Sequence, residues 1–124
     1  MYLVLSTLAG ALALAFAFYL SAGISSKDPG NARMKEIAGY IHEGAMAFLY
    51  REYRYLAIFI VIVAAVLALF ISWQTAACFL GGALCSILAG YFGMQVATKA
   101  NVRTAAAAQH GISPALKIAF SGGS

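Results

Sequence analysis

The chain has 124 residues, of which 63% are hydrophobic and 10% are charged, whereas an ordinary soluble domain has roughly 45–50% apolar and about 25% charged residues. This composition excludes a soluble globular protein, and without a soluble basic module the net charge of +4 does not indicate a nucleic-acid-binding domain. All charged residues lie within 27–54 and 99–117. A membrane span needs about 20 apolar residues, so the uncharged stretches 1–26 and 55–98 predict one span and two spans, respectively.

The first predicted span covers residues 2–24. A cleaved signal peptide is the alternative for an N-terminal apolar run, but no Lys or Arg precedes this run, and it is longer than the usual signal core of about 7–15 residues. We therefore predict a retained helix. Small residues recur at every fourth position, a spacing typical of membrane helices that approach each other closely; they are Ala9, Ala13, Ala17 and Ser21.

The turn formers and helix-capping residues at 25–31 predict a break, after which a second helix begins. Its first part mixes charges with an apolar stripe at helical spacing, made of Met34, Ile37, Ile41, Ala45 and Phe48. No proline interrupts the pattern before Trp73. A helix over 31–73 would be about 64 Å long, whereas a bilayer core is about 30 Å thick. We expect 55–73, flanked by Tyr53, Tyr55 and Trp73, to cross the membrane and the first half to extend into the cytoplasm.

A short uncharged turn at 72–75 leads to the third predicted span, 76–98. Gly82, Ser86 and Gly90 are spaced four residues apart in this span, which predicts a face built for close helix packing. A helical stretch then continues to Gln109. Ser113 and Pro114 are typical of an N-cap and a first-turn proline, so we expect a fourth helix from 114 that is truncated at 121–124.

The distribution of Lys and Arg predicts the orientation. With three spans, the charged segments 25–54 and 99–117 lie on the same side of the membrane, and they contain every Lys and Arg. By the positive-inside rule both segments are cytoplasmic and the N-terminus is outside. The sequence therefore predicts an all-α, polytopic membrane helical bundle with three transmembrane helices, the start of a fourth and a long second helix. We expect it in the cell inner membrane.

Residues that could carry chemistry are sparse. The three spans hold no ionisable side chain of the kind that marks an ion pathway, and His42-Glu43 is not an H-E-x-x-H motif because Met46 stands at the second histidine position. Cys78 and Cys85 are too far apart along one helix to form a disulfide, so we predict two buried thiols. Arg33 and Glu36 are expected to pair along the helix. We therefore predict no catalytic, no cofactor-binding and no metal-binding residue in this chain.

Three stretches resemble the membrane-bound ion-pumping pyrophosphatases. The stretch from Gly30 to Tyr53 reads GNARMKEIAGYIHEGAMAFLYREY and resembles the start of these proteins. The segments GGALCS (81–86), AGYFGM (89–94) and ATKANVRTA (97–105) are similar to the third helix of the family and its cytoplasmic end, and ALKIAFSGG (115–123) is similar to the segment that opens the fourth. Order and spacing agree over 30–123, whereas 1–29 agrees only as an apolar first helix.

This resemblance implies that 1–124 is the N-terminal membrane part of a larger pump. The whole protein would hydrolyse pyrophosphate with Mg²⁺ at the cytoplasmic face and move H⁺ or Na⁺ across the membrane. It would be a homodimer whose remaining membrane helices pack against this part within the lipid bilayer; nucleic acid is not an expected partner. K⁺ dependence does not follow from these residues. The family's metal-binding, substrate-binding and gate residues belong to later helices, so the fragment alone is expected to be an inactive scaffold.

The alternative hypothesis comes from a different class of protein. The chain could be a stand-alone accessory or assembly protein with three membrane helices and no catalysis. Such a protein would be expected to end in a finished element, whereas the segment from Pro114 begins a helix and then stops.

Overall fold

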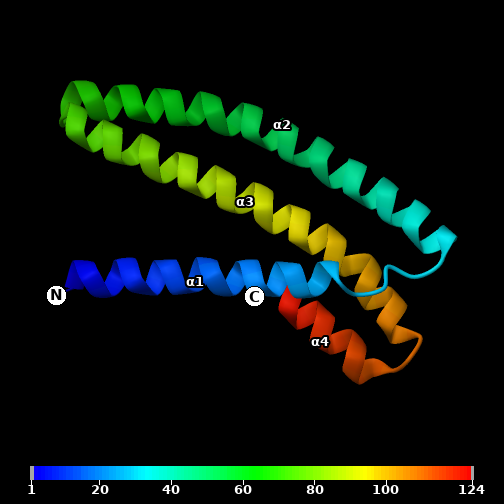
Figure 1. Cartoon of the computed structure of the whole chain (residues 1–124). Coiled ribbons are helices and arrows are strands. Elements are labelled where there is room, and N and C mark those ends of the chain that lie inside the picture. The colour runs from blue at the N-terminus through cyan, green and yellow to red at the C-terminus, as the bar shows by residue number, and fades with distance from the viewer. Residues whose placement is uncertain (1, 124) are drawn as a thin grey trace. The chain divides into compact units, whose positions relative to one another are not determined.

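The structure is a computed structural model that describes residues 2–123 (Figure 1). This part of the chain forms the helices α1 (Tyr2–Ser25), α2 (Ala32–Phe70), α3 (Trp73–Ala108) and α4 (Ile112–Gly123), and it contains no strand. The first three helices are long and apolar enough to cross a membrane. The predicted all-α class, with three membrane-spanning helices and a fourth helix, is confirmed.

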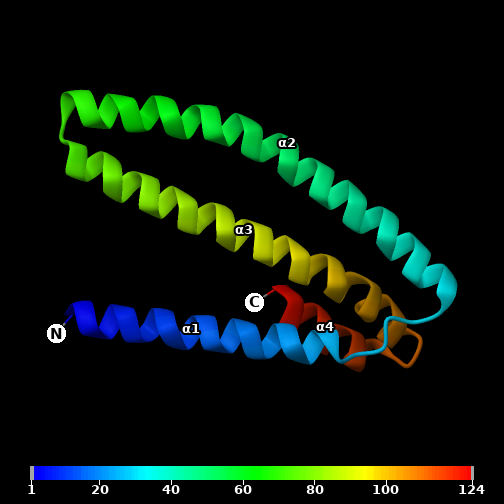
Figure 2. The same ribbon diagram turned by 45° about the horizontal axis from the view of Figure 1, so that its top comes forward.

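The chain divides into two compact units, and both α2 and α3 run through the two. The hairpin unit consists of 41–95, and the end unit consists of 1–40 together with 96–124. Within the hairpin unit the two helices lie side by side, as two views show (Figures 1 and 2). The end unit contains α1, the beginning of α2, the end of α3 and α4.

The turn of the hairpin unit is shorter than the sequence indicates. Helix α2 ends at Phe70 rather than at Trp73, and α3 already begins at Trp73. The cause is Ser72, whose hydroxyl accepts a hydrogen bond from the Thr75 N–H at 3.2 Å and thereby caps the helix. The predicted turn at 72–75 is therefore wrong in its length, because Thr75 lies inside the first turn of α3.

Polar contacts join the two helices of the hairpin unit, and one of them is the 3.7 Å contact from the Gln95 amide to the Met46 sulfur. The Tyr53 hydroxyl donates a hydrogen bond of 2.9 Å to the Ile87 carbonyl. Gly90 lies next to it, and a Cβ at this position would be 3.0 Å from the Tyr53 hydroxyl oxygen. The hydroxyl reaches the backbone because Gly90 has no side chain. Tyr53 therefore serves helix packing, and only Tyr55 and Trp73 of the predicted interfacial aromatics are largely exposed.

The predicted small-residue face of α3 contacts the rest of the described chain at Gly90 alone among its glycines. A Cβ at Gly82 would meet no atom within 4 Å, and Ser86 is exposed. Cys78 and Cys85 are also exposed on this helix. The prediction that these thiols are buried is wrong for this chain, because no other part of the hairpin unit covers that surface.

Polar residues define the helix ends in the end unit. The Asn31 side chain accepts a hydrogen bond from the Met34 N–H at 2.9 Å and caps α2. Asp28 accepts one from the Gly30 N–H, and Gly30 itself adopts a positive φ of 85°. The predicted break at 25–31 is confirmed. Helix α3 ends before Gly111, which also has a positive φ, as is common at helix C-termini.

Helix α4 begins at Ile112, before the predicted Ser113 cap, and remains helical through Gly123. It lies against α1 within the end unit. Their packing buries Ile24 and Ile118, together with small residues such as Ala100. A Cβ added to Gly122 would lie 2.5 Å from the Ala100 Cβ. The sequence predicted that this helix is cut off at 121–124, but it continues through Gly123, and Gly122 allows it to approach α3.

Gly90→Ala is expected to destabilise the purified protein relative to Gly82→Ala by about 1 kcal/mol, the usual worth of one hydrogen bond. Both variants gain the helix propensity of alanine, but only the first forces the Tyr53 hydroxyl away from Ile87. Thermal unfolding in detergent measures the difference. Tyr53→Phe should reproduce the loss, and equal melting temperatures for the two glycine variants would contradict this role of Gly90.

Gly122→Ala should loosen α4, because the added methyl overlaps with Ala100; overpacking of this kind costs about 1–3 kcal/mol. Gly123→Ala is the matched control, since its Cβ would meet nothing within 4 Å. Limited proteolysis at the turn 109–111 is the measurement. We expect faster cleavage for the first variant only, and identical cleavage of both would show that α4 does not depend on the contact.

Candidate functional site

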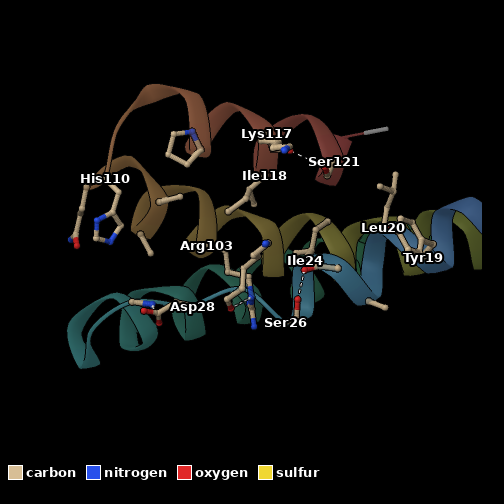
Figure 3. Close-up of a pocket in the computed structure, with 18 residues that line it drawn as sticks. Tyr19, Leu20, Ile24, Ser26, Asp28, Arg103, His110, Lys117, Ile118 and Ser121 are labelled. Carbon is tan, nitrogen blue, oxygen red and sulfur yellow. Dashed lines mark hydrogen bonds between the residues drawn. The ribbon is translucent and has the colours of Figure 1, made fainter.

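A pocket of about 570 Å³ lies within the end unit, where the ends of α1 and α3 meet α4. It is partly open to the surroundings rather than enclosed. Figure 3 shows its lining, with His110 at one end and Tyr19 at the other. The charged and imidazole side chains that line it are Lys27, Asp28, Arg103, His110 and Lys117, and the larger apolar ones are Tyr19, Leu20, Ile24 and Ile118.

Arg103 is the best-placed polar group in this pocket. From α3 its guanidinium donates hydrogen bonds to the Lys27 carbonyl at 3.0 Å and to the Ser25 carbonyl at 3.4 Å, both at the end of α1. It also donates to the Lys99 carbonyl one turn earlier in α3, at 3.0 Å. The last carbonyls of a helix lack intrahelical partners and carry partial negative charge. Arg103 therefore supplies the C-terminal cap of α1 from a distant part of the sequence.

The pocket has a positive electrostatic character. Lys27, Arg103 and Lys117 are cationic, and Asp28 is the acidic residue among the lining residues. One oxygen of that carboxylate already accepts the hydrogen bond from Gly30. The two lysine side chains are exposed to the surroundings. An anionic group entering the pocket would therefore meet an excess of positive charge.

The larger apolar side chains of the lining come from α1 and, for Ile118, from α4. Ile24 and Ile118 are nearly fully buried, at 3% and 9% exposure, whereas Tyr19 is 73% exposed. Tyr19 lies six residues, or about 9 Å, before Ser25 at the end of α1. One cavity is thus lined by both cationic and apolar side chains, and Tyr19 lies at the end away from His110 (Figure 3).

The pocket is lined by one carboxylate, Asp28, and one imidazole, His110. Among residues 2–123 there is no group of three His, Cys, Asp or Glu side chains that could hold a metal ion. The predicted Arg33–Glu36 pair is confirmed at 2.8 Å, but it lies on the exposed surface, where such pairs contribute little. Asp28 lines the pocket without a second carboxylate beside it. The arrangement can bind an anion and fix a helix end, but it offers no paired acid and base.

Sequence reasoning predicted no site residue and therefore did not find this pocket. The motif ATKANVRTA contains Arg103, but the sequence assigned no role to this residue. A usable signal was present: the last turn of α1 contains no basic residue of its own, so the cation that favours a helix C-terminus had to come from elsewhere. Which cation supplies it depends on how α3 and α4 fold back on α1.

Comparison with known proteins gives a consistent result. The family described as inorganic H⁺ pyrophosphatase matches residues 11–124. A Clostridium tetani protein with the provisional name K⁺-stimulated pyrophosphate-energized sodium pump is 66% identical over 122 residues. The K⁺-insensitive pyrophosphate-energized proton pump of Methanosarcina mazei is 49% identical over 119 residues, and the K⁺-stimulated pyrophosphate-energized sodium pump of Thermotoga maritima is 45% identical over 115.

The three alignments cover 98%, 94% and 91% of this chain but only 18%, 18% and 16% of the respective relatives. The chain thus spans less than a fifth of the length of the proteins that it matches. Sodium pumps and a proton pump both occur among them, so their names alone do not separate the two ions.

Arg103→Lys is expected to weaken the attachment of α1 although it keeps the charge, because an ammonium group cannot reproduce the fork of the guanidinium. The loss should be about 1.5 kcal/mol, the lower value for hydrogen bonds to charged groups. Hydrogen exchange of the amides near Ser25 measures it, with faster exchange expected. Arg33→Lys, at an exposed position of the same unit, is the control; equal exchange in both variants would contradict the assignment.

Proposed function

Because the chain belongs to the inorganic H⁺ pyrophosphatase family, we propose that it is a membrane-embedded part of a pump that uses pyrophosphate hydrolysis to move H⁺ or Na⁺ across the membrane. The observation that carries this proposal is the 66% identity to a pyrophosphate-energized pump over 98% of the chain. The three apolar helices support it, since they fit a multi-pass membrane protein. The proposed enzyme class is a membrane-bound inorganic pyrophosphatase.

Within such a pump, the chain acts as scaffold. Mg²⁺ is the cofactor that the family resemblance implies, but the described residues bring together no set of ligands that fits it. We therefore derive no chemical step from this chain. What its residues do is span the bilayer and hold helices together, through Tyr53 and Gly90 in the hairpin unit and through Arg103 in the end unit.

The exposed surface supports a place among further helices. Leu12, Leu14 and Phe18 of α1 are each at least 70% exposed, and the Gly82 side of α3 is open. Such surfaces are suited to contact lipid or neighbouring membrane helices. We propose that the remaining helices of the pump, and a second copy in a homodimer, cover part of them.

Orientation is the other part of the proposal. The N-terminus lies outside the cell, and 25–54 and 99–117 face the cytoplasm, because they contain every Lys and Arg of the chain. The inner membrane is the proposed location. Pyrophosphate would then be hydrolysed at the same face, where the long α2, 39 residues in length, extends beyond the bilayer.

The scaffold role predicts that this chain can replace its counterpart in a working relative. A chimaera in which residues 1–124 substitute for the aligned segment of the Clostridium tetani protein should retain pyrophosphate hydrolysis and pyrophosphate-driven ion uptake into vesicles. The chain expressed alone should show neither. Uptake of ²²Na⁺ and acidification of the vesicle interior, measured in parallel, identify the ion.

A correctly inserted chimaera without hydrolysis would contradict the scaffold role, because the exchanged segment would then be incompatible with the catalytic machinery. The stand-alone accessory protein is tested separately by sequencing the native gene beyond codon 124. A frame that continues for several hundred codons supports the pump, whereas a stop codon directly after Ser124 favours the accessory protein.

A further inference from the structure

We propose that the pocket between α1, α3 and α4 binds one anionic phospholipid, with its phosphate at Lys27 and Lys117 and an acyl chain along Tyr19 and Leu20. Each of these residues lines the same cavity. The proposal concerns the end unit alone and does not depend on which ion the pump moves.

The position of the pocket fits a lipid headgroup. Helix α1 is uncharged throughout, and Lys27 is the first charged residue after it. In α3 the first charged residue is Lys99, one turn before Arg103. Each of these lysines marks the point where an apolar helix segment ends. Arg103 of α3 donates hydrogen bonds to carbonyls at the end of α1, so these two points lie at the same level within the end unit. The pocket therefore lies at the edge of the membrane, where phosphate groups are found.

Charge complementarity selects an anionic group. The two exposed lysines have no acidic partner in the pocket other than Asp28, and that carboxylate is partly engaged by Gly30. Arg103 uses three N–H groups on carbonyls, and a guanidinium has five. Two of its donors thus remain for a phosphate oxygen. Basic pockets between membrane helices on the cytoplasmic side are typical sites for anionic headgroups.

The apolar part of the lining distinguishes a lipid from a free phosphate ion. An inorganic phosphate would occupy only the space beside the lysines, whereas the lining also includes Ile24, Leu20 and Tyr19. Tyr19 is 73% exposed although it belongs to the membrane-spanning stretch. The volume of about 570 Å³ is sufficient for a headgroup with the first part of its chains, since pockets for small molecules measure about 300–1,000 Å³.

The test uses the native pump that carries this chain, stripped of lipid in detergent and titrated with phosphatidylglycerol or phosphatidylcholine under native mass spectrometry. We expect one phosphatidylglycerol to bind in preference to phosphatidylcholine. The double variant Lys27→Gln with Lys117→Gln should lower the affinity for phosphatidylglycerol about 30-fold, which is the effect expected for losing two lysines near a membrane surface. Lys35→Gln with Lys99→Gln removes the same charge from the end unit outside the pocket and should leave binding within about threefold.

Further arms identify the occupant. Lys27→Arg with Lys117→Arg should restore binding, and added inorganic phosphate should not displace the lipid. Equal losses in the pocket and control pairs would overturn the proposal, since general surface attraction would explain them. Displacement by phosphate alone would overturn it in favour of a free-anion site. In one further outcome, phosphatidylglycerol fails to bind while Lys27 and Lys117 are also inaccessible to amine-reactive reagents. That result would overturn the proposal, because another segment of the protein would then fill the pocket.

Discussion

Backbone hydrogen bonding in a medium without water governs the architecture of this chain. In the hydrocarbon core each peptide group must find its partner within its own helix, because no solvent replaces it. The described chain accordingly consists of long helices, and its polar breaks are restricted to the short segments 26–31, 71–72 and 109–111. Each break uses a local device, such as the Ser72 cap or the positive φ of Gly30 and Gly111. The side chains between the breaks then determine only how the helices contact each other.

These contacts depend on small residues rather than on a large apolar core. Apart from Ile24, Leu49 and Ile118, the buried hydrophobic residues are alanines. Between membrane helices the hydrophobic effect contributes little, because lipid is as apolar as leucine, so close approach and hydrogen bonds must hold them. Tyr53 against Ile87 and Arg103 against the end of α1 are such hydrogen bonds. Gly90 and Gly122 provide the space that brings the backbones near enough.

The sequence predicted those features that follow from the distribution of charge and of helix breakers. Uncharged stretches of sufficient length indicate spans whatever their neighbours are, and the break at 25–31 carries its own capping residues.

Features that depend on a neighbouring helix were not predicted. Four-residue spacing marked Gly82 and Gly90 alike, but only Gly90 faces Tyr53 in this chain. Cys78 and Cys85 were expected to be buried because they cannot form a disulfide with each other, but both are exposed; in a membrane such a side chain can equally face lipid. The pocket required the return of α4 onto α1, which no local pattern specifies.

The cap on α1 also constrains the order in which the end unit can form. Its parts are 1–40 and 96–124, so the whole hairpin unit separates them along the chain. Helix α1 contains no basic residue in its last turn, and the guanidinium that satisfies its carbonyls comes 76 and 78 residues after Lys27 and Ser25. Insertion from the N-terminus would therefore leave the end of α1 without this cap until α3 has crossed the membrane. Only then can α4 fold back onto Ile24 and close the pocket. In the proposed orientation the end unit faces the anionic surface of the cytoplasmic leaflet, so Lys27 would meet lipid phosphate before α3 and α4 are in place. This order would favour the lipid-binding role proposed for the pocket.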